Sequence, residues 1–409
     1  MILFPIFLFM SYKGQQTLSY IIYLVFLINM LSRENRKSFL TKIDKRLTKG
    51  LIIFILLPFA ISIVSGGLTS RVGVDHYLFW LIFFPLVYFI DTQKKLNFFI
   101  KSFFIGGTIS LLIALGIFIK DYNIWVHPEG FYYPRIAFEL QEQDFANVMS
   151  IFLIFLLSYL FFYKNSKNKR KNLVIKIILS SVALLDLFII VVNRSKMVYV
   201  CLLPAIIYLL YKKNKKYIFI FFTLCICGFF ILPNSITSRV KNIPKITEDP
   251  SSNLRLLFWD AAISSIQKSP ILGMKTKDRI KFNFNHFKEK GTMDYVAKFY
   301  GVDEVGITNT HNMYLHHFAN YGIVGFLGLV YFFFIVIPSR LMKIKFFREK
   351  IKKKSNYIAL EIGLKSAYIA YLIQGITEFN LNKKPMVFLC SILLFILNFL
   401  LCSKAPKSK

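Results

Sequence analysis

Long apolar stretches alternate with short polar ones along the whole chain. A helix needs about 20 apolar residues to cross the core of a bilayer, and most of the stretches come close to that length. The pattern therefore predicts an all-α polytopic membrane helix bundle of about 12 transmembrane helices, of which the first is the shortest. The apolar stretches cover residues 1–11, 18–32, 50–66, 75–91, 98–119, 145–163, 173–192, 196–212, 217–233, 314–337, 357–379 and 384–402.

The strongly basic polar segments all follow even-numbered apolar stretches. Because cytoplasmic loops are rich in Lys and Arg, this alternation predicts that these segments and both chain termini are cytoplasmic. An odd number of spans between any two of them would place them on opposite faces, so the alternation also supports the even count. The basic segments are residues 33–49, 91–97, 164–172, 212–216 and 339–355.

The composition agrees with a membrane protein and argues against a nucleic-acid-binding protein. Hydrophobic residues make up 56% of the 409 residues, and the formal net charge is +31. Such a charge in a soluble protein is typical of nucleic-acid binding. Here the cations lie in short loops between apolar stretches, so membrane topology explains them and we expect lipids, not nucleic acid, around the protein. The five cysteines lie in or beside apolar stretches and indicate neither a zinc site nor disulfides.

Two longer polar segments are left for the outward side, residues 120–144 and 234–312. Polar loops held by a rigid bundle often carry function. We therefore expect three parts: residues 1–233 with the first nine membrane helices, residues 234–312 as an outward loop that contains short helices and the catalytic residues, and residues 313–409 with the last three membrane helices.

Two arginines on the outward side are candidates for binding an anion. Arg194 stands between two apolar stretches, against the bias that keeps basic residues inside. Arg255 follows Ser252 and Asn253, either of which can cap a helix over residues 251–270, so it is expected in the first turn, where free N–H groups favour an anion. A guanidinium group binds phosphate through paired hydrogen bonds. The alternatives are an arginine that snorkels at a helix end for Arg194 and a lipid headgroup contact for Arg255.

Aromatic and further basic side chains accompany these arginines. Trp259 lies four residues after Arg255, so the two share one face of the expected helix. Arg135 ends the sequence YYPR in the other outward segment, where a surface cluster of aromatic and basic residues is the alternative interpretation.

Three histidines lie close together where residues 310–317 lead into an apolar stretch. On a helix, His316 and His317 would point well away from His311, so the spacing gives no face for a metal ion, and we expect no metal. His311 can accept a proton near neutral pH. It can also be an interfacial polar residue without a chemical role. Arginines, aromatic rings and a histidine on one side, without a glycosidase-type pair of carboxylates, indicate glycosyl transfer from a polyprenyl pyrophosphate.

These residues also resemble the signature of the O-antigen ligase and polymerase superfamily of bacterial membrane proteins. In that pattern an S-R or R-S pair begins a span, R-x-x-x-W and a P-x-x-G turn follow, and H-N-x-x-L leads into a span that contains glycines. The serine and arginine stand in the order R-S here, which leaves the role of the serine open. The matching residues are Arg194, Ser195, Arg255, Trp259, Pro270, Gly273, His311, Asn312, Leu315, Gly322 and Gly325.

The resemblance implies an O-antigen ligase, which transfers a glycan from undecaprenyl pyrophosphate to the lipid A-core at the periplasmic face of the inner membrane, without metal or other cofactor. It implies that Arg255 and Arg194 bind the pyrophosphate and that His311 is the base for the acceptor hydroxyl, so Arg255 and His311 are the expected catalytic residues. The expected substrate-binding residues are Arg194, Arg135, Trp259 and Asn312.

Other functions remain open at this stage. An O-antigen polymerase uses the same donor but often has two long arginine-rich outward loops, whereas one loop dominates here. A lipid-oligosaccharide flippase or transporter would need ionisable residues within spans, and a non-catalytic assembly protein is a further alternative. The ionisable residues within the expected spans are Asp186, Glu361, Lys365 and Glu378, of which Glu361 and Lys365 are spaced to pair with each other.

Overall fold

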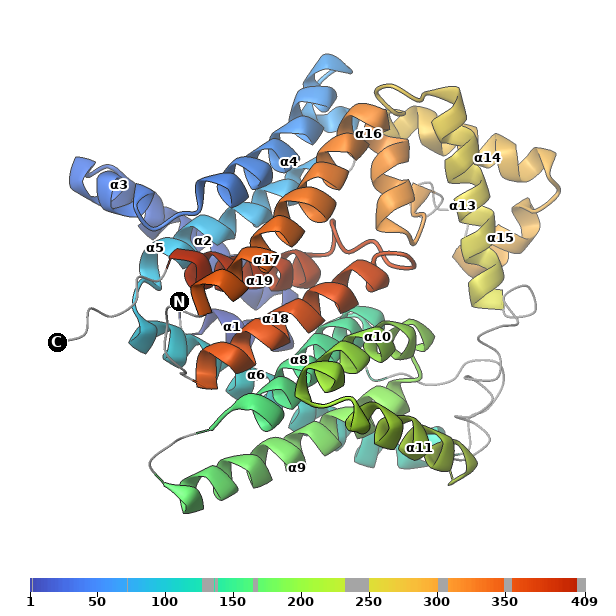
Figure 1. The fold of residues 1–409 in the computed structure, drawn as a ribbon. Helices are drawn as coiled ribbons and strands as arrows, with labels where there is room; N and C mark the ends of the chain where they lie inside the picture. Colours follow the sequence, from blue (N-terminus) through green and yellow to red (C-terminus); the bar gives the residue numbers. More distant parts are fainter. Residues whose placement is uncertain are drawn as a thin grey trace.

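The computed structural model describes residues 1, 3–71, 73–126, 136, 139–164, 168–231, 250–300, 308–348 and 355–402. Every regular element in these residues is a helix, which confirms the predicted all-α class for this part of the chain (Figure 1).

The elements before residue 232 correspond closely to the predicted apolar stretches. They are α1 (Phe4–Met10), α2 (Tyr12–Met30), α3 (Arg33–Leu40), α4 (Lys45–Val64), η1 (Leu68–Ser70), η2 (Val74–Ile82), α5 (Phe83–Phe89), α6 (Gln93–Lys120), α7 (Tyr122–Val126), α8 (Glu142–Phe162), α9 (Lys169–Asn193), α10 (Lys196–Lys213) and α11 (Lys216–Ile231).

The elements after residue 249 are the helices of the expected outward loop and the last apolar helices. They are α13 (Pro250–Lys268), α14 (Thr276–Glu289), α15 (Met293–Tyr300), α16 (Met313–Val330), the π-helix η4 (Tyr331–Val336), α17 (Ile337–Arg348), α18 (Ser355–Gln374) and α19 (Lys384–Cys402).

Six helices among the described residues are long and apolar enough to cross a membrane, which supports a multi-pass membrane protein. They are α4, α6, α8, α9, α19 and the stretch Met313–Ile344, which runs from α16 through η4 into α17. A seventh arises if α2 and α3, which meet at an angle of 109°, are taken as one broken span. The other predicted segments are helical but shorter or less apolar, so the count of about 12 spans stays a prediction.

Side-chain caps explain where several of these helices begin. Ser11, Asp44, Thr92, Asn168 and Asn312 directly precede α2, α4, α6, α9 and α16, and each accepts a hydrogen bond from the N–H group three residues later. Small polar side chains at these positions satisfy a backbone donor that has no partner inside the helix.

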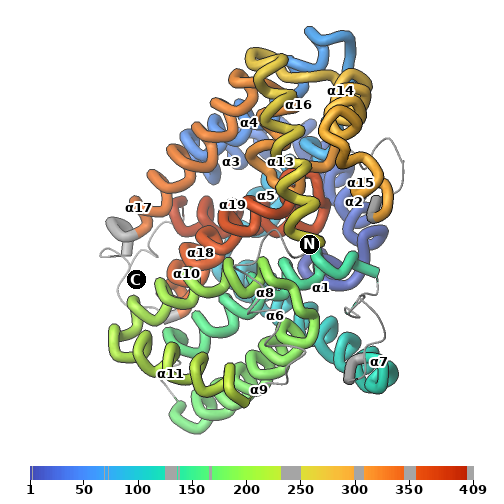
Figure 2. Tube along the Cα trace, turned by 90° about the vertical axis from the view of Figure 1, so that its right-hand side faces the viewer, coloured from blue at the N-terminus to red at the C-terminus, as the bar shows by residue number. Residues whose placement is uncertain are grey.

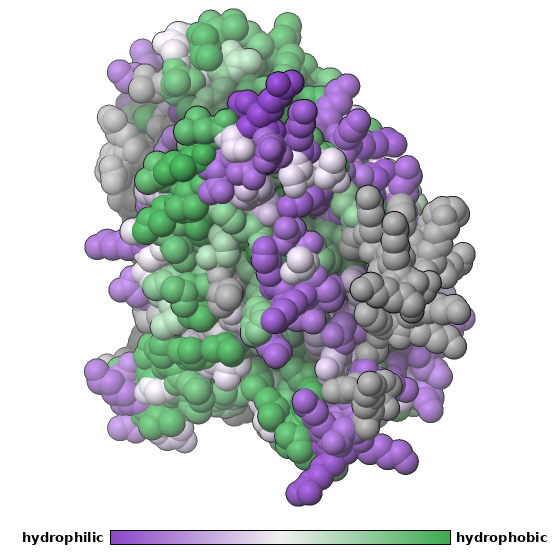
Figure 3. All heavy atoms as spheres, turned by 90° about the vertical axis from the view of Figure 1, so that its left-hand side faces the viewer, coloured by the Kyte–Doolittle hydropathy of each residue, from purple (hydrophilic) through white to green (hydrophobic). Residues whose placement is uncertain are grey.

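The bundle has a buried centre and an exposed apolar periphery. In α19, 94% of the apolar segment is buried inside the bundle, whereas only 22% of the apolar segment of α9 is buried. Helix α18 packs against α8 and α10 near the centre, and α9 and α11 lie at the edge (Figure 1). Figure 3 shows the end that carries α3, where hydrophilic side chains gather in a band bordered by hydrophobic ones.

Helices α13, α14 and α15 lie at the opposite end of the bundle from α3 (Figures 1 and 2). Helix α13 contacts α16 and α14, so these helices are packed onto the bundle. This end of the molecule therefore holds Arg255 and Trp259, which the sequence singled out for chemistry.

Helix α16 is broken at Gly322, where φ is 60° and ψ is −166°. The turn of residues 270–274 fills the break: Ile323 N–H donates to Pro270 O at 2.7 Å, and Met274 N–H donates to Ala319 O at 2.9 Å. A β-carbon added to Gly322 would lie 2.1 Å from Ile271 O, so only glycine allows this approach. The P-x-x-G turn and the glycine-bearing helix of the sequence motif are thus two sides of one contact.

Candidate active site

Arg255 and Trp259 lie on α13, as the sequence predicts, but their helix begins earlier than expected. Pro250 already belongs to α13, so neither Ser252 nor Asn253 caps it, and Arg255 lies in the second turn. Proline fits the first turn because it has no N–H group to leave unsatisfied there. The expectation that Arg255 sits beside free backbone donors in a first turn is therefore wrong, and the guanidinium itself is the donor at this position.

Arg255 forms a salt bridge with a carboxylate from a distant part of the chain. Its Nη2 lies 3.2 Å from Glu378 Oε1, and the two side chains are 17% and 3% exposed. Glu378 belongs to the turn between α18 and α19, where its N–H donates to Gln374 O. An arginine that contacted only lipid headgroups would not have a buried carboxylate as its partner, so this pair favours the site over the headgroup alternative.

Lys383 extends this pair into a buried network. Its Nζ lies 3.4 Å from Glu378 Oε2 and 2.8 Å from Asp144 Oδ1, and the hydroxyl of Tyr12 donates to the other oxygen of Asp144. The members come from α2, α8, α13 and the turn between α18 and α19. Burying such charges is costly unless they are paired, and here each carboxylate has more than one partner.

The protonation states of this network follow from its packing. Burial by itself raises the pKa of Glu378, but Lys383, Arg255 and His311 together outweigh it and hold the pKa below its usual value. Burial lowers the pKa of Lys383, and Glu378 and Asp144 more than reverse this effect. Glu378 and Lys383 are therefore both charged at neutral pH.

His311 lies beside this network and not on a helix. Its φ of 45° is in the left-handed region, and its N–H donates to Asn309 Oδ1 at 3.0 Å. Its ring is 6.2 Å from the ring of Phe258, which projects from α13 between Arg255 and Trp259 in the sequence. Burial lowers its pKa to about 4, with Glu378 opposing the shift and Arg255 and Lys383 adding to it. The imidazole is therefore neutral at pH 7.

The two following histidines have separate surroundings. Because His311 precedes α16, the angles expected from a continuous helix do not apply to it. The ring of His316 packs against Phe379, next to Glu378 in the chain, with 3.7 Å between ring centroids and a tilt of 31° between the rings. His317 is a core residue that shares a hydrogen bond of 2.7 Å with the hydroxyl of Tyr77. No three His, Cys, Asp or Glu side chains of the described residues are grouped as metal ligands; metal independence stays a prediction.

Asn312 and Trp259 differ in how their polar atoms are used. Asn312 caps α16: its Oδ1 accepts from the N–H groups of Tyr314 at 2.9 Å and Leu315 at 3.0 Å. Its side-chain oxygen is therefore occupied by the fold. The indole Nε1 of Trp259 is buried and has no hydrogen-bond partner among the described residues. An indole N–H normally finds an acceptor when it is buried, so Trp259 has a donor to offer a ligand.

Arg194 lies at the same end of the bundle. It ends α9 with a φ of 57° and is 4% exposed. The preceding Asn193 donates to Ile136 O at 3.3 Å and to Glu142 O at 3.5 Å, which places it beside the start of α8 and two residues from Asp144. A snorkelling arginine would be exposed at the surface of the bundle, so the burial of Arg194 disfavours that alternative. Arg135 lies outside the described residues, and its role stays a prediction.

Glu378, Lys383 and Asp144 were not recognised as site residues from the sequence. Glu378 was counted within an apolar span, but α18 already ends at Gln374 and Glu378 lies in the turn beyond it. The available signal was an acidic and a basic residue five positions apart at the outward boundary of the last two apolar stretches.

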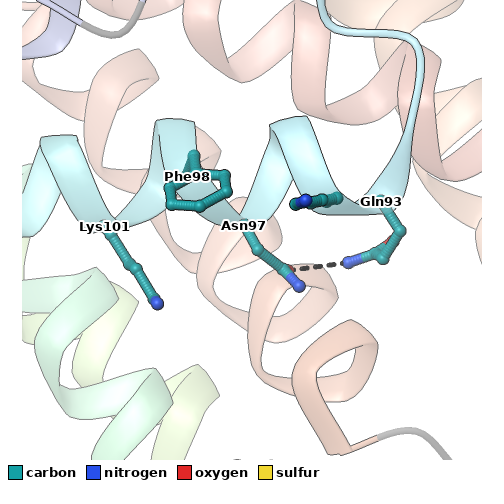
Figure 4. Close-up of a pocket in the computed structure, with 5 residues that line it drawn as sticks. Gln93, Asn97, Phe98 and Lys101 are labelled. Carbon is teal, nitrogen blue, oxygen red and sulfur yellow. Dashed lines mark hydrogen bonds between the residues drawn. The ribbon is translucent and has the colours of Figure 1, made fainter.

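A cavity of about 430 Å³ lies away from this cluster. It is at the start of α6, near the basic end of the bundle, and Figure 4 shows that its labelled side chains come from that one helix. The residues that line it are Gln93, Lys94, Asn97, Phe98 and Lys101.

Comparison with known families supports the superfamily that the motifs predicted, and it does not separate a ligase from a polymerase. Residues 179–330 match the O-antigen ligase family model. The match supports the O-antigen ligase and polymerase superfamily, as the motifs predicted, and it spans a little over a third of the chain. No curated protein matches the chain.

The O-antigen ligase match contains Arg194, Arg255, Trp259, His311 and Asn312, so it covers both sides of the contact between α13 and His311. Members of this family are glycosyltransferase-like enzymes, and the family implies lipid-linked glycan substrates in a membrane. The partners that the structure adds to Arg255 lie in parts of the chain outside the match.

Proposed function

We propose that this protein is an O-antigen ligase that transfers a glycan from undecaprenyl pyrophosphate to the lipid A-core at the periplasmic face of the inner membrane. The observation that carries the proposal is the position of neutral His311 beside Arg255, within the region that matches the family. A base and an anion-binding guanidinium side by side are what glycosyl transfer from a pyrophosphate requires.

The reaction joins one bond and breaks another. The oxygen of an acceptor sugar hydroxyl attacks the anomeric carbon of the donor while His311 takes the hydroxyl proton. The bond between that carbon and the pyrophosphate oxygen breaks, and undecaprenyl pyrophosphate leaves with the bonding electrons. Its developing charge is stabilised by Arg255, with Arg194 as a second phosphate ligand.

The low pKa of His311 in the free protein makes it a weak base, and donor binding corrects this. A base is most effective when its pKa is close to the working pH. The pyrophosphate brings negative charge next to the imidazole, which raises the pKa of His311, and Glu378 acts in the same direction. The bound donor therefore prepares the base for the proton it is to receive.

Arg255 must exchange partners when the donor binds. In the structure it contacts Glu378 through one nitrogen, whereas a phosphate can be held by two parallel hydrogen bonds. Lys383, which already contacts Glu378, keeps that carboxylate paired when Arg255 turns to the phosphate. The network thus holds Arg255 near the site without a permanent bidentate partner.

The remaining predicted residues have supporting roles in this proposal. Trp259 offers its indole face to a sugar ring and its free N–H to a donor oxygen. Arg135 is a further basic contact on the outward side. Asn312 supports His311 by capping the next helix, and only its amide nitrogen is left for substrate.

The proposal includes the predicted organisation of the chain in the membrane. Residues 1–233 and 313–409 form membrane helices, residues 234–312 are periplasmic, and both termini are cytoplasmic, since the basic segments lie on one side. Reporters fused at residues 290 and 345 test this. A fusion at residue 290 that is active only in the cytoplasm would contradict the arrangement.

The function is tested by the lipopolysaccharide of a deletion strain. We expect loss of polymer-capped lipopolysaccharide and accumulation of lipid-linked polymer, with recovery by the wild-type gene. Lipid A-core capped by single repeat units would instead identify a polymerase, and donor trapped on the cytoplasmic side would identify a flippase.

Metal independence is tested with purified protein, a lipid-linked donor and a lipid A-core acceptor. Activity should persist in excess chelator, because arginines supply the positive charge that a metal ion would otherwise provide. Loss of activity in chelator and its recovery with a divalent ion would refute this part.

A further inference from the structure

Two arginines outside the cluster around Glu378 are buried at the break of α16. Arg71 lies between η1 and η2 and is 2% exposed, and Arg279 lies on α14 and is 0% exposed. Neither matches a residue of the sequence motif. Their hydrogen bonds to other described residues all end on uncharged oxygens. Burying a charge without an opposite charge as its hydrogen-bond partner costs free energy, which suggests that these arginines have a role.

Arg279 joins two segments on either side of the candidate base. Its Nη1 donates to Asn320 Oδ1 at 2.7 Å, two residues before the break of α16. Its Nη2 donates to Thr308 O at 2.7 Å, three residues before His311. One side chain therefore fixes both the end of the first half of α16 and the backbone that leads into His311.

Arg71 holds the other side of the same contact. It donates to Leu272 O at 2.9 Å and to Ser65 Oγ at 3.0 Å, and it also donates to Met274 O and Asn320 O. These bonds fix the turn of residues 270–274 in the break of α16. Arg71 and Arg279 thus meet at Asn320, through its backbone and its side chain.

His311 needs this support because its backbone is strained. A residue with a β-carbon at a φ of 45° is uncommon, and such conformations persist only where the surroundings hold them. Downstream of His311, Asn312 caps α16 and Met313 N–H donates to Gly375 O at 2.8 Å. Upstream, the bond from Arg279 to Thr308 O supplies a corresponding restraint.

We propose that Arg279 is a positioning residue for His311, and that it acts by fixing the backbone at Thr308 to the end of the first half of α16. The geometry suits arginine because the two oxygens are reached by two nitrogens of one planar group. The carbonyl end of a helix segment favours a cation, which offsets part of the cost of burying the charge. Burial, with Arg71 adding to it, lowers the pKa of Arg279 to about 9, so it is still charged at neutral pH.

The proposal is tested first by the chemical reactivity of His311, which requires no assumption about the reaction catalysed. The purified full chain is treated with diethyl pyrocarbonate at pH 7, and modification of each histidine is followed by peptide mass spectrometry. We expect slow modification of His311 in the wild type and at least a tenfold increase in Arg279→Ala. Lys281→Ala, which removes an exposed cation from the same helix, should behave as the wild type.

His286 serves as an internal reference. It also lies on α14, and its Nε2 contacts Asp260 at 2.7 Å, away from Thr308. An increase at His311 with unchanged His286 supports the proposal. Unchanged reactivity at His311 overturns it, and an equal increase at both histidines also overturns it, because the whole segment has then loosened. Arg279→Lys, which can keep only part of the contact, should give an intermediate rate at His311.

A consequence for turnover rests on the proposed function. If His311 is the base, Arg279→Ala should lower kcat by about a hundredfold, as expected when a catalytic group is displaced by about 1 Å, with the donor KM little changed. If His311 becomes more reactive in Arg279→Ala but the wild-type protein proves to have no ligase activity, the proposed function alone is refuted. The positioning role would then remain, without its consequence for catalysis.

Discussion

The two ends of the helix bundle both carry ion pairs, but they differ in burial. At the end with α13, Glu378 and Asp144 are 3% and 1% exposed and share Lys383. At the other end, Asp91 lies between Lys42 at 3.0 Å and Lys95 at 2.7 Å, with side chains that are 26% to 54% exposed. Exposed pairs of this kind contribute about 0–1 kcal/mol each. Burying charges costs much more free energy than such exposed pairs contribute. The first network therefore points to function, and the second to placement in the membrane.

The basic end also has a more enclosed pair, Asp44 with Arg340, and it shows what a structural role looks like. Asp44 caps α4, and its N–H donates to Asn398 Oδ1 at 2.7 Å. Its partners thus join helices to one another. Burial alone does not separate the two ends. The combination of buried charges with neutral His311 does.

The largest effect is expected from His311→Ala. Loss of a general base typically lowers the rate by about a hundred- to ten-thousand-fold, and donor binding should be preserved because Arg255 remains. His311→Gln keeps a hydrogen-bond donor but cannot take up the proton, so it should be as inactive as His311→Ala. Substantial activity in His311→Gln would leave the arginines as the only catalytic groups. Kinetics with purified protein measure both variants.

His286→Ala is the matched control for this prediction, since His286 lies on α14, 25 positions before His311, with its own partner, Asp260. It should keep near wild-type activity. His316 and His317 are unsuitable controls, although the sequence predicts that both point away from His311. The ring of His316 packs against Phe379, the residue after Glu378. His317 is buried in the core and shares a hydrogen bond with Tyr77.

The next effect is expected from Arg255→Lys. The charge remains, but lysine cannot form the paired hydrogen bonds to phosphate. The loss should be about 1.5–3 kcal/mol of transition-state binding, which is about ten- to a hundredfold in kcat/KM. Expression and membrane insertion should be normal. Equal activity of the lysine variant would reassign Arg255 to a lipid headgroup.

Glu378→Gln distinguishes the network from an ordinary buried ion pair. Without the carboxylate charge, Arg255 is released, so donor KM should fall, while kcat should drop about tenfold because protonated His311 loses a stabilising charge. Glu361→Gln is the control: Glu361 pairs with Lys365 at 2.6 Å within α18. Both variants should lose stability. Only Glu378→Gln should lower the donor KM, which favours catalysis, and also lower kcat, which opposes it. Identical kinetics in the two variants would contradict a role for Glu378.

The pH dependence of the wild type follows from the pKa of His311. The base must be neutral, so kcat/KM should be constant from pH 7 to about 5 and should fall below about 4. The acid limb of kcat should lie at higher pH than that of kcat/KM, because the bound pyrophosphate raises the pKa of His311. An acid limb of kcat/KM near pH 6.5 would indicate an exposed histidine or a different base.

The smallest effect is expected from Asp91→Asn at the basic end. The ordinary limit for such exposed pairs predicts a change of at most about 1 kcal/mol in the free energy of unfolding. Activity should equal that of the wild type. A large loss of activity in this variant would show that the two ends of the bundle are coupled.

The sequence predicted the helices well because apolar length and small polar caps are local signals. It also placed Arg255 and His311 on one side of the bundle from motif order and sidedness, and the two lie close enough for Arg255 to lower the pKa of His311. It could not identify the partners of Arg255, because Glu378 lies 123 positions away and paired charges leave no local pattern. The strained backbone at His311 and the break at Gly322 were likewise invisible, since both depend on contacts with segments distant in sequence.

The turn inserted into α16 has a consequence for making hybrid proteins. The turn after α13 is joined to α16 through backbone hydrogen bonds at Pro270 and Met274, and these require glycine at position 322. If residues 250–300 were replaced by those of a relative, only one of the two sides of this contact would be exchanged. An interchangeable unit in this protein therefore does not end where α16 begins. A working exchange has to carry α16 together with residues 250–300, so that the exchangeable unit includes an apolar helix long enough to cross a membrane.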